Sequence, residues 1–133
     1  MLWSSMTDLE LNEALLEAVA HGDWPAIKEC LQNGADIHYV RSIDSPAGPQ
    51  PVTVLSMVMF RISDSTLDTP ELLKFREITA FLLAHGAGTE HAMALAEDRY
   101  GPYDDTLSDE HYTVMPPWRL IAKAHLQRQN KLQ

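Results

Sequence analysis

Residues 11–36 read LNEALLEAVAHGDWPAIKECLQNGAD and carry the clearest structural pattern in the chain. Apolar side chains recur there at the spacing of an amphipathic helix, beginning with Leu11, Leu15, Leu16, Ala18 and Val19. We expect Gly22 to end this helix and Asp23 to cap a second helix that stops before Gly34. Residues 8–34 therefore predict two short helices joined by a tight turn, which is a helical hairpin.

The end of this stretch has a second copy further along the chain. LQNGAD at 31–36 matches LAHGAG at 83–88, and each copy follows a helical apolar pattern. The helix before the second copy is expected at 70–85, because Pro70 and Glu71 suit a first helical turn. A repeated segment of this kind is typical of folds built from stacked units.

The Gly-Ala-Asp ending of the first copy, with Gly22 twelve residues before Gly34, resembles the ankyrin repeat. In that family a Thr-Pro-Leu-His tetrapeptide opens the inner helix of each unit, and the resemblance assigns TVLS at 53–56 to this place in the second unit. It implies an inner helix at 53–61, whose apolar, β-prone start alone would also fit a strand. The spacing departs from the family, because Gly34 and Gly86 are 52 residues apart, against 33 in a standard ankyrin period.

We therefore expect an all-α fold: a short ankyrin-repeat solenoid of stacked helical hairpins with long connecting loops, in one domain over 1–133. One unit cannot bury its own hydrophobic face, so about three are needed. The expected units are repeat 1 at about 11–39, repeat 2 at about 51–89 with insertions, and a divergent C-terminal cap at about 90–130 with helices at 90–99 and 116–130. Loops are expected at 40–52, which holds three prolines and a glycine, at 63–70 and at 101–114.

The charge of the chain is unbalanced, with 19 acidic residues against 10 basic ones and a net charge of −9. Such a surface repels nucleic acid and anionic membranes, and it favours a basic protein partner. The imbalance follows the sequence, because residues 1–118 hold every acid and only six bases, whereas the last helix holds four bases and no acid. We expect no membrane span, and cytoplasmic localisation, because the N-terminus lacks a signal pattern and the chain lacks a long apolar run.

No pattern for a cofactor, a metal or a catalytic nucleophile stands out. The chain has no phosphate-binding loop, no dinucleotide fingerprint and no nucleophile elbow, and its six histidines are scattered. The acids between 104 and 110 lack the spacing of a calcium loop. The single cysteine, Cys30, cannot form an internal disulfide and is expected to be a buried, reduced thiol. A small enzyme that uses acids near His111 stays as a minor alternative.

The resemblance implies a protein that binds another protein without catalysis. We predict an acidic inhibitor of a basic protein, such as an immunity protein that neutralises a nuclease-type toxin; the alternative is a generic adaptor or a subunit of a larger assembly. The run that contains Met57, Met59 and Phe60 is expected to be core, with a groove for a partner helix as the alternative.

Two segments hold the candidate partner-binding residues. The insertion at 40–52 falls where the family has its finger-like hairpin loops, and its candidates are Tyr39, Arg41, Ile43 and Asp44. The segment 98–112 combines tyrosines with acids, and its candidates are Tyr100, Tyr103, Asp104, Asp105, Asp109, Glu110 and Tyr112. As alternatives, the insertion only connects two units, and the second segment is a solvated acidic loop whose tyrosines pack on the core.

Overall fold

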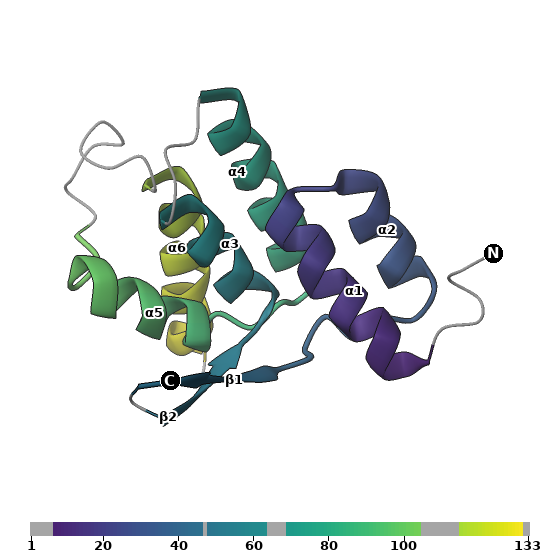
Figure 1. The fold of residues 1–133 in the computed structure, drawn as a ribbon. Coiled ribbons are helices and arrows are strands. Elements are labelled where there is room, and N and C mark those ends of the chain that lie inside the picture. Colours follow the sequence, from purple (N-terminus) through teal and green to yellow (C-terminus); the bar gives the residue numbers. More distant parts are fainter. Residues whose placement is uncertain (1–6, 47, 64–68, 105–114, 132–133) are drawn as a thin grey trace.

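The computed structural model describes residues 7–46, 48–63, 69–104 and 115–131. In these ranges the chain is mostly helical, with one small two-stranded sheet (Figure 1). The helices are α1 (Asp8–His21), α2 (Trp24–Gln32), α3 (Val54–Ser63), α4 (Thr69–Ala84), α5 (Glu90–Tyr100) and α6 (Met115–Lys131). The strands β1 (Arg41–Ser45) and β2 (Gly48–Val52) lie between α2 and α3.

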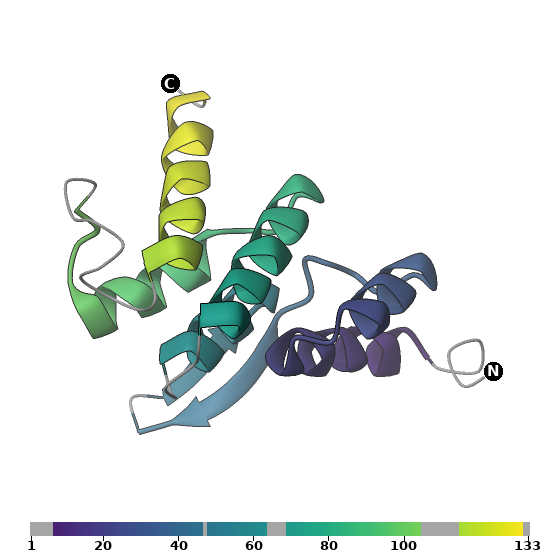
Figure 2. The same ribbon diagram turned by 90° about the horizontal axis from the view of Figure 1, so that it is seen from above.

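Successive helices pack as pairs, and the pairs pack side by side. α1 contacts α2, α3 contacts α4 and α5 contacts α6, while α3 also contacts both α1 and α5. Seen from above in Figure 2, the blue, teal and yellow helices α2, α4 and α6 lie on one side of the molecule, behind α1 and α5. We call α1, α3 and α5 the front layer and α2, α4 and α6 the back layer.

Local capping explains why the first two helices form as predicted. The Thr7 hydroxyl accepts a hydrogen bond from the Glu10 N–H at 3.1 Å, and the Glu10 carboxylate accepts one from the Thr7 N–H at 3.0 Å. Gly22 ends α1 in the left-handed conformation, and the Asp23 carboxylate caps α2 through the Ala26 N–H at 3.3 Å. The helical hairpin predicted at 8–34 is therefore confirmed.

The two matching segments end α2 and α4 with the same backbone hydrogen bonds. In each, the glycine N–H donates to the carbonyl three residues back and the alanine N–H donates to the carbonyl five residues back. The bonds are Gly34 to Leu31 (3.2 Å), Ala35 to Cys30 (2.9 Å), Gly86 to Leu83 (3.0 Å) and Ala87 to Leu82 (3.0 Å). Both glycines have positive φ, 103° and 88°. The likeness at 31–35 and 83–87 is therefore one of conformation as well as of sequence.

The prediction of a loop at 40–52 was wrong, because this segment forms an antiparallel β-hairpin. Its register pairs Arg41 with Val52 and Ser45 with Gly48. Pro49 and Pro51 alternate with Gln50, so their missing N–H groups fall on the outer side of an edge strand, where no ladder bond is lost. The prolines suggested a loop, but a two-stranded sheet accommodates them, and the fold is all-α only apart from this hairpin.

The other helix predictions agree closely with the structure. The segment 53–61 is helical, as α3, and the Thr53 hydroxyl caps it by accepting the Ser56 N–H at 3.3 Å. The helices expected at 70–85 and 90–99 are α4 and α5. The last helix begins at Met115 rather than at 116, so both prolines lie in its first turn, where proline is tolerated.

A hydrophobic core runs through all six helices. Its large, fully buried side chains include Leu15 and Leu16 from α1, Phe75 and Ile78 from α4, and Trp118 from α6. The central helix α3 contributes the most, with Val54, Leu55, Val58, Met59 and Ile62 all buried. The expectation that Met59 belongs to the core is confirmed, whereas Met57 and Phe60 are half-buried at its edge.

Candidate interaction surface and pocket

The open side of α3 is the front of the molecule, because other elements cover the rest of this helix. α1 and α5 flank it, α4 and α6 pack behind it, and β2 contacts it. Met57, Phe60 and Arg61 are the half-buried side chains of α3, and their spacing puts them on one helical face. The Arg99 guanidinium from α5 lies 5.5 Å from the centre of the Phe60 ring. The middle of the front layer is therefore apolar, with Arg99 beside it, whereas the Arg61 guanidinium lies 3.9 Å from the Glu71 carboxylate on α4.

Charge separates between the two layers. Among the side chains that the structure describes, the front layer and the hairpin carry eight acids and three bases: Asp8, Glu10, Glu13, Glu17, Asp44, Glu90, Glu97 and Asp98, with Arg41, Arg61 and Arg99. The back layer carries three acids and six bases: Glu29, Glu71 and Glu77, with Lys28, Lys74, Arg76, Arg119, Lys123 and Arg128. Helices alternate between layers along the chain, so the fold sorts the charges across its thickness.

Arg41 fastens the hairpin to α1. Its Nε and Nη2 atoms lie 2.7 Å from Glu13 Oε2, and Nη2 lies 3.4 Å from Glu17 Oε1. Partial burial acts to lower the pKa of this guanidinium, but the hydrogen bonds and charges of Glu13 and Glu17 outweigh it, so the pKa is raised. This candidate residue therefore faces its own chain and neutralises part of the acidic surface of α1.

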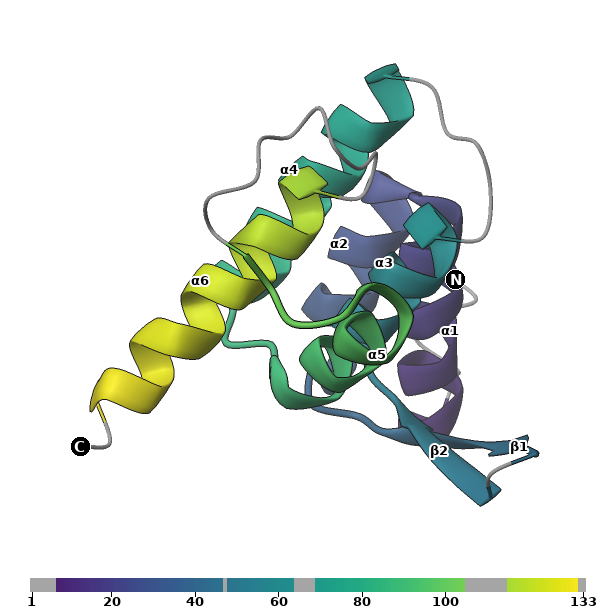
Figure 3. The same cartoon turned by 90° about the vertical axis from the view of Figure 1, so that its left-hand side faces the viewer.

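The other hairpin candidates differ in how accessible they are. Tyr39 is half-buried against the core, and its N–H donates to the Asp36 carbonyl at 3.1 Å. Ile43 is half-buried in β1, opposite Gln50, whereas Asp44 is exposed opposite Pro49. Figure 3 shows the hairpin projecting below the helices, so Asp44 is the one of these candidates that the hairpin presents openly.

The second candidate segment is described only in part. The rings of Tyr100 and Tyr103 lie 5.3 Å and 5.5 Å from the Trp118 ring, and both tyrosines are half-buried. These contacts match the alternative in which the tyrosines pack on the core. Asp104 is exposed beside them. The remaining residues of interest, Asp105, Asp109, Glu110, His111 and Tyr112, lie outside the described residues.

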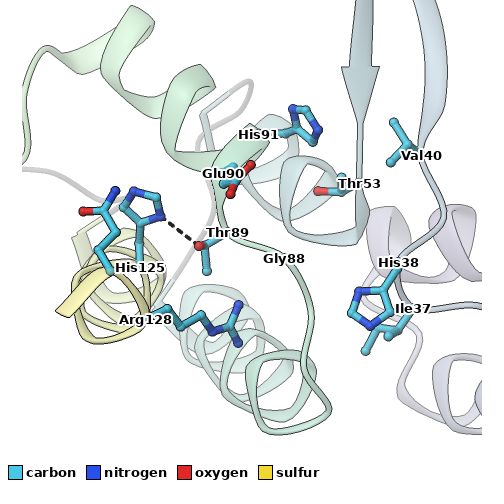
Figure 4. Close-up of a pocket in the computed structure, with 11 residues that line it drawn as sticks. Ile37, His38, Val40, Thr53, Gly88, Thr89, Glu90, His91, His125 and Arg128 are labelled. Atoms are coloured by element: carbon cyan, nitrogen blue, oxygen red, sulfur yellow. Dashed lines mark hydrogen bonds between the residues drawn. The ribbon is translucent and has the colours of Figure 1, made fainter. Parts of the chain in front are cut away.

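A pocket of about 430 Å³ lies where the base of the hairpin approaches α6 (Figure 4). Its walls come from the segment after α2, the segment around the start of α5, and the last turns of α6. On the side of the pocket opposite His38 and Val40, the Thr89 hydroxyl and His125 Nδ1 are 2.9 Å apart (Figure 4). Arg128 donates to the carbonyls of Ala87 at 2.6 Å and Leu83 at 3.5 Å, so it caps the end of α4.

None of the candidate partner-binding residues predicted from the sequence lines this pocket. The contact between Thr89 and His125 joins residues 36 apart, and no spacing rule connects them. His38 and His91 also line the pocket, but within the described part of the chain no three His, Cys, Asp or Glu side chains are grouped to hold a metal. Glu90 carries a negative charge and Arg128 a positive one. The two charges balance, so the pocket does not add to the acidic surface.

Cys30, the single cysteine, is fully buried in α2 and does not line this pocket. Burial raises the pKa of its thiol, and the negative charges of Glu29 and Asp23 raise it further. A raised pKa reduces the thiolate fraction, and the thiolate is the nucleophilic form. This agrees with the expectation of a buried structural thiol.

No family model matches the chain, and no curated protein or solved structure matches it. Within the described residues, no helix has both the length and the apolar character needed to cross a membrane.

Proposed function

We propose that this chain is an ankyrin-like protein-interaction module without catalytic activity, whose front layer and hairpin bind a basic protein. The separation of charge carries the proposal: the front layer and the hairpin hold eight acids against three bases, whereas the back layer holds three against six. A surface dominated by one charge attracts partners of the opposite charge and speeds their encounter.

Three features support the ankyrin-like part of the proposal. The helices pack as successive pairs that lie side by side. The turns after α2 and α4 share the two backbone hydrogen bonds donated by their glycine and alanine N–H groups, and they lie 52 residues apart. A β-hairpin projects between the first pair and the second. The hairpin and the segment between α3 and α4 account for a spacing longer than the standard period of 33 residues.

The proposed partner is a nucleic-acid-binding toxin, such as a nuclease, and the chain acts as its inhibitor. A nuclease must neutralise phosphates with lysine and arginine, so it carries a basic surface. An acidic protein can cover that surface and exclude the substrate. The half-buried Met57 and Phe60 would supply apolar contact in the middle of the front layer.

Affinity capture from native extract tests this proposal. The wild-type chain is compared with a front variant, Asp44→Asn with Asp98→Asn, and with a back-layer control, Glu77→Gln. All three positions are exposed, so the fold should not change. We expect the wild type and the control to retain the same basic protein, with an association rate that falls steeply as salt rises, and the front variant to associate several-fold more slowly.

Two outcomes would contradict the proposal: a partner without excess positive charge, or an association rate equal for the front variant and the control. Inhibition is a separate measurement on the captured partner. If the partner is a nuclease and a one-to-one complex suppresses its activity, the inhibitor role is supported. If the partner keeps its activity in the complex, the chain is the adaptor or assembly subunit instead.

A further inference from the structure

The two edges of the β-hairpin differ in what they can bond. In β2, Pro49 and Pro51 flank Gln50, which pairs with Ile43 of β1. In an antiparallel ladder, residues whose N–H and C=O groups face the partner strand alternate with residues whose groups face outward. Proline has no N–H, so the ladder bonds pass through Gln50 and both prolines hold outward positions. The outer edge of β2 therefore offers a further strand no donor at either proline.

β1, in contrast, has an open edge. Ser42 and Asp44 lie opposite the two prolines, so their N–H and C=O groups also face away from the ladder. Within the described residues, neither N–H donates to another backbone carbonyl. Both side chains are exposed, and Figure 3 shows the hairpin projecting below the helices. Two donors and two acceptors in a row form a template on which another strand can pair.

The charges beside this edge favour a basic strand. Asp44 is exposed on β1, and none of the ion pairs among the described residues includes it. Arg41 is the only Lys or Arg of the hairpin and of α1, and it is shared between Glu13 and Glu17. β1 and its contacts on α1 therefore hold three acids against one base, and Asp44 is the acid with which this base does not pair.

A second copy of this strand suits the edge less well. Two β1 strands could pair antiparallel about Ile43, which would satisfy the outward groups of Ser42 and Asp44. That arrangement brings two Asp44 carboxylates to the same face of the sheet, while Arg41 stays paired with α1. Like charges across a sheet are destabilising, and a strand that carries cations on this face avoids the repulsion.

We propose that β1 accepts an extended basic segment of the partner protein as a third, antiparallel strand of the sheet. Ser42 and Asp44 exchange backbone hydrogen bonds with this segment. Its side chains alternate between the two faces, so cations lie beside Asp44 and apolar side chains lie beside the half-buried Ile43. This inference rests on the proposed function, because the segment belongs to the proposed basic partner.

An NMR titration of the full-length chain with a synthetic peptide tests the inference. The probe is Lys-Val-Lys-Val-Lys with blocked ends, which combines the alternation with the charge. At concentrations up to about 2 mM, the range of weak contacts, we expect the amide signals of Ser42 and Asp44 to shift. Amide hydrogen exchange at both residues should slow several-fold, because both N–H groups gain an acceptor. The peptide Glu-Val-Glu-Val-Glu should not bind, because it opposes Asp44 with like charges.

Two N-methylated peptides separate strand pairing from simple attraction of charge. In the antiparallel pairing, the N–H groups of the lysines face β1 and those of the valines face away. N-methylation of the central lysine should therefore abolish binding, whereas N-methylation of one valine should leave it unchanged. The two peptides carry the same charge and the same added methyl group, so each is the matched control of the other.

Variants of the chain test the same contact from its other side. Ser42→Pro removes one outward N–H and no ladder bond, as the prolines of β2 do, so we expect the lysine peptide to bind about tenfold more weakly or worse. Ser42→Ala is the matched control, because it keeps the N–H. Amide exchange at Ile43 checks that the hairpin persists. If it does not, the methylated peptides still decide the question on the wild-type chain.

Several results would overturn the inference. One is the absence of binding at 2 mM lysine peptide, and another is equal binding of the glutamate peptide. A third is a lysine-methylated peptide that binds as tightly as the valine-methylated one, or more tightly. A Ser42 amide signal that shifts with protein concentration alone would assign the edge to a second copy instead.

Affinity capture distinguishes this inference from the proposed function. If a basic partner is captured and Ser42→Pro leaves its association unchanged, the strand contact is refuted and the proposed function stands. If no basic partner is captured but the lysine peptide pairs with β1 as expected, the edge binds basic strands and the proposed function is refuted.

Discussion

Gly22 ends its own helix, α1, and also lets the distant helix α4 pack closely against the turn. Its φ of 66° is in the left-handed region, which closes α1 and turns the chain into α2. A β-carbon at this position would lie 2.9 Å from Lys74 Cε and 3.3 Å from Phe75 Cζ, both on α4. The turn and the close approach of α4 therefore both require a residue without a side chain.

We expect Gly22→Ala to destabilise the fold by about 1–2 kcal/mol, the cost of the left-handed conformation for a residue with a β-carbon. The long Lys74 side chain can move aside, whereas the Phe75 ring is buried and adds to this cost. Urea unfolding measures the change. Gly88→Ala is the control, because Gly88 has no positive φ and open space around it. Equal losses at the two positions would refute this explanation.

The capping box at the start of α1 makes its contribution to stability depend on pH, through the Glu10 carboxyl. Hydrogen bonds from the Thr7 backbone, and then from its side chain, lower the pKa of the Glu10 carboxyl. The pKa is lower in the folded chain, so this contribution to stability is present above the ordinary pKa of glutamate. It is lost as the pH falls through the folded pKa.

An NMR titration of the Glu10 carboxyl tests this response. We expect its midpoint to lie below the value in the unfolded chain, and Thr7→Ala to raise it by removing the hydroxyl. Thr7→Ser retains a hydroxyl and should leave the midpoint low. If the alanine and serine variants titrate alike, the side chain of Thr7 has no part in the shift.

At the scale of elements, the hairpin depends on contacts with the helices around its base. β1 and β2 form a sheet of two strands, which is marginally stable in isolation. Arg41 joins β1 to α1, and β2 contacts α3 and α5. The ordered position of the hairpin therefore depends on its attachment at these points.

We expect Arg41→Gln to loosen the hairpin while leaving the helices intact. Glu13 and Glu17 are partly exposed, so the loss of global stability should stay below about 1 kcal/mol. Amide hydrogen exchange at Ile43 and Gln50 should become several-fold faster. Ser42→Ala, on the outer side of the same strand, is the control. Unchanged exchange in the Arg41 variant would show that β2 alone holds the hairpin.

At the scale of the whole molecule, the core connects both ends of the row of helices. Trp24 on α2 contacts Phe81 on α4, with ring centres 5.3 Å apart. Trp118 is buried in α6 and contacts the rings of Tyr100 and Tyr103. The same cluster of buried side chains includes α1 and α6. Such continuity couples the helix pairs.

We therefore expect the chain to unfold in one cooperative transition. Helix content by circular dichroism reports all the pairs, and Trp118 fluorescence in a Trp3→Phe, Trp24→Phe background reports the last pair. The two signals should give the same denaturation midpoint. An earlier transition in the Trp118 signal would mean that α5 and α6 unfold as a separate unit.

Sequence patterns predicted most of the helices because the interactions involved are local. The Thr7–Glu10 capping box, Asp23 and the glycine turns act within a few residues, and the apolar spacing of α1 and α4 marks their buried faces. The hairpin escaped prediction because its prolines suggested a loop. Its stability depends on pairing Arg41 with Val52 and on the contact with Glu13, which is 28 residues from Arg41.

The candidate surface was predicted only in outline. The excess of acid was visible in the composition, and the candidate Asp44 is exposed on the hairpin. However, Arg41 is paired with α1, and Tyr100 and Tyr103 pack against Trp118. The pocket at Thr89 and His125 had no signal at all, because only packing brings these residues together.

The sequence by itself determined where helices begin and end, and that the chain as a whole is acidic. Only the tertiary structure decided that the acids gather on the front layer and the bases on the back. Along the sequence, all acids precede the last helix, which holds only bases. In the fold, successive helices lie in opposite layers, so acids and bases are divided between the layers instead. The physical reason is one of range: capping and periodicity act over a few residues, whereas the grouping of charges depends on which distant helices pack together.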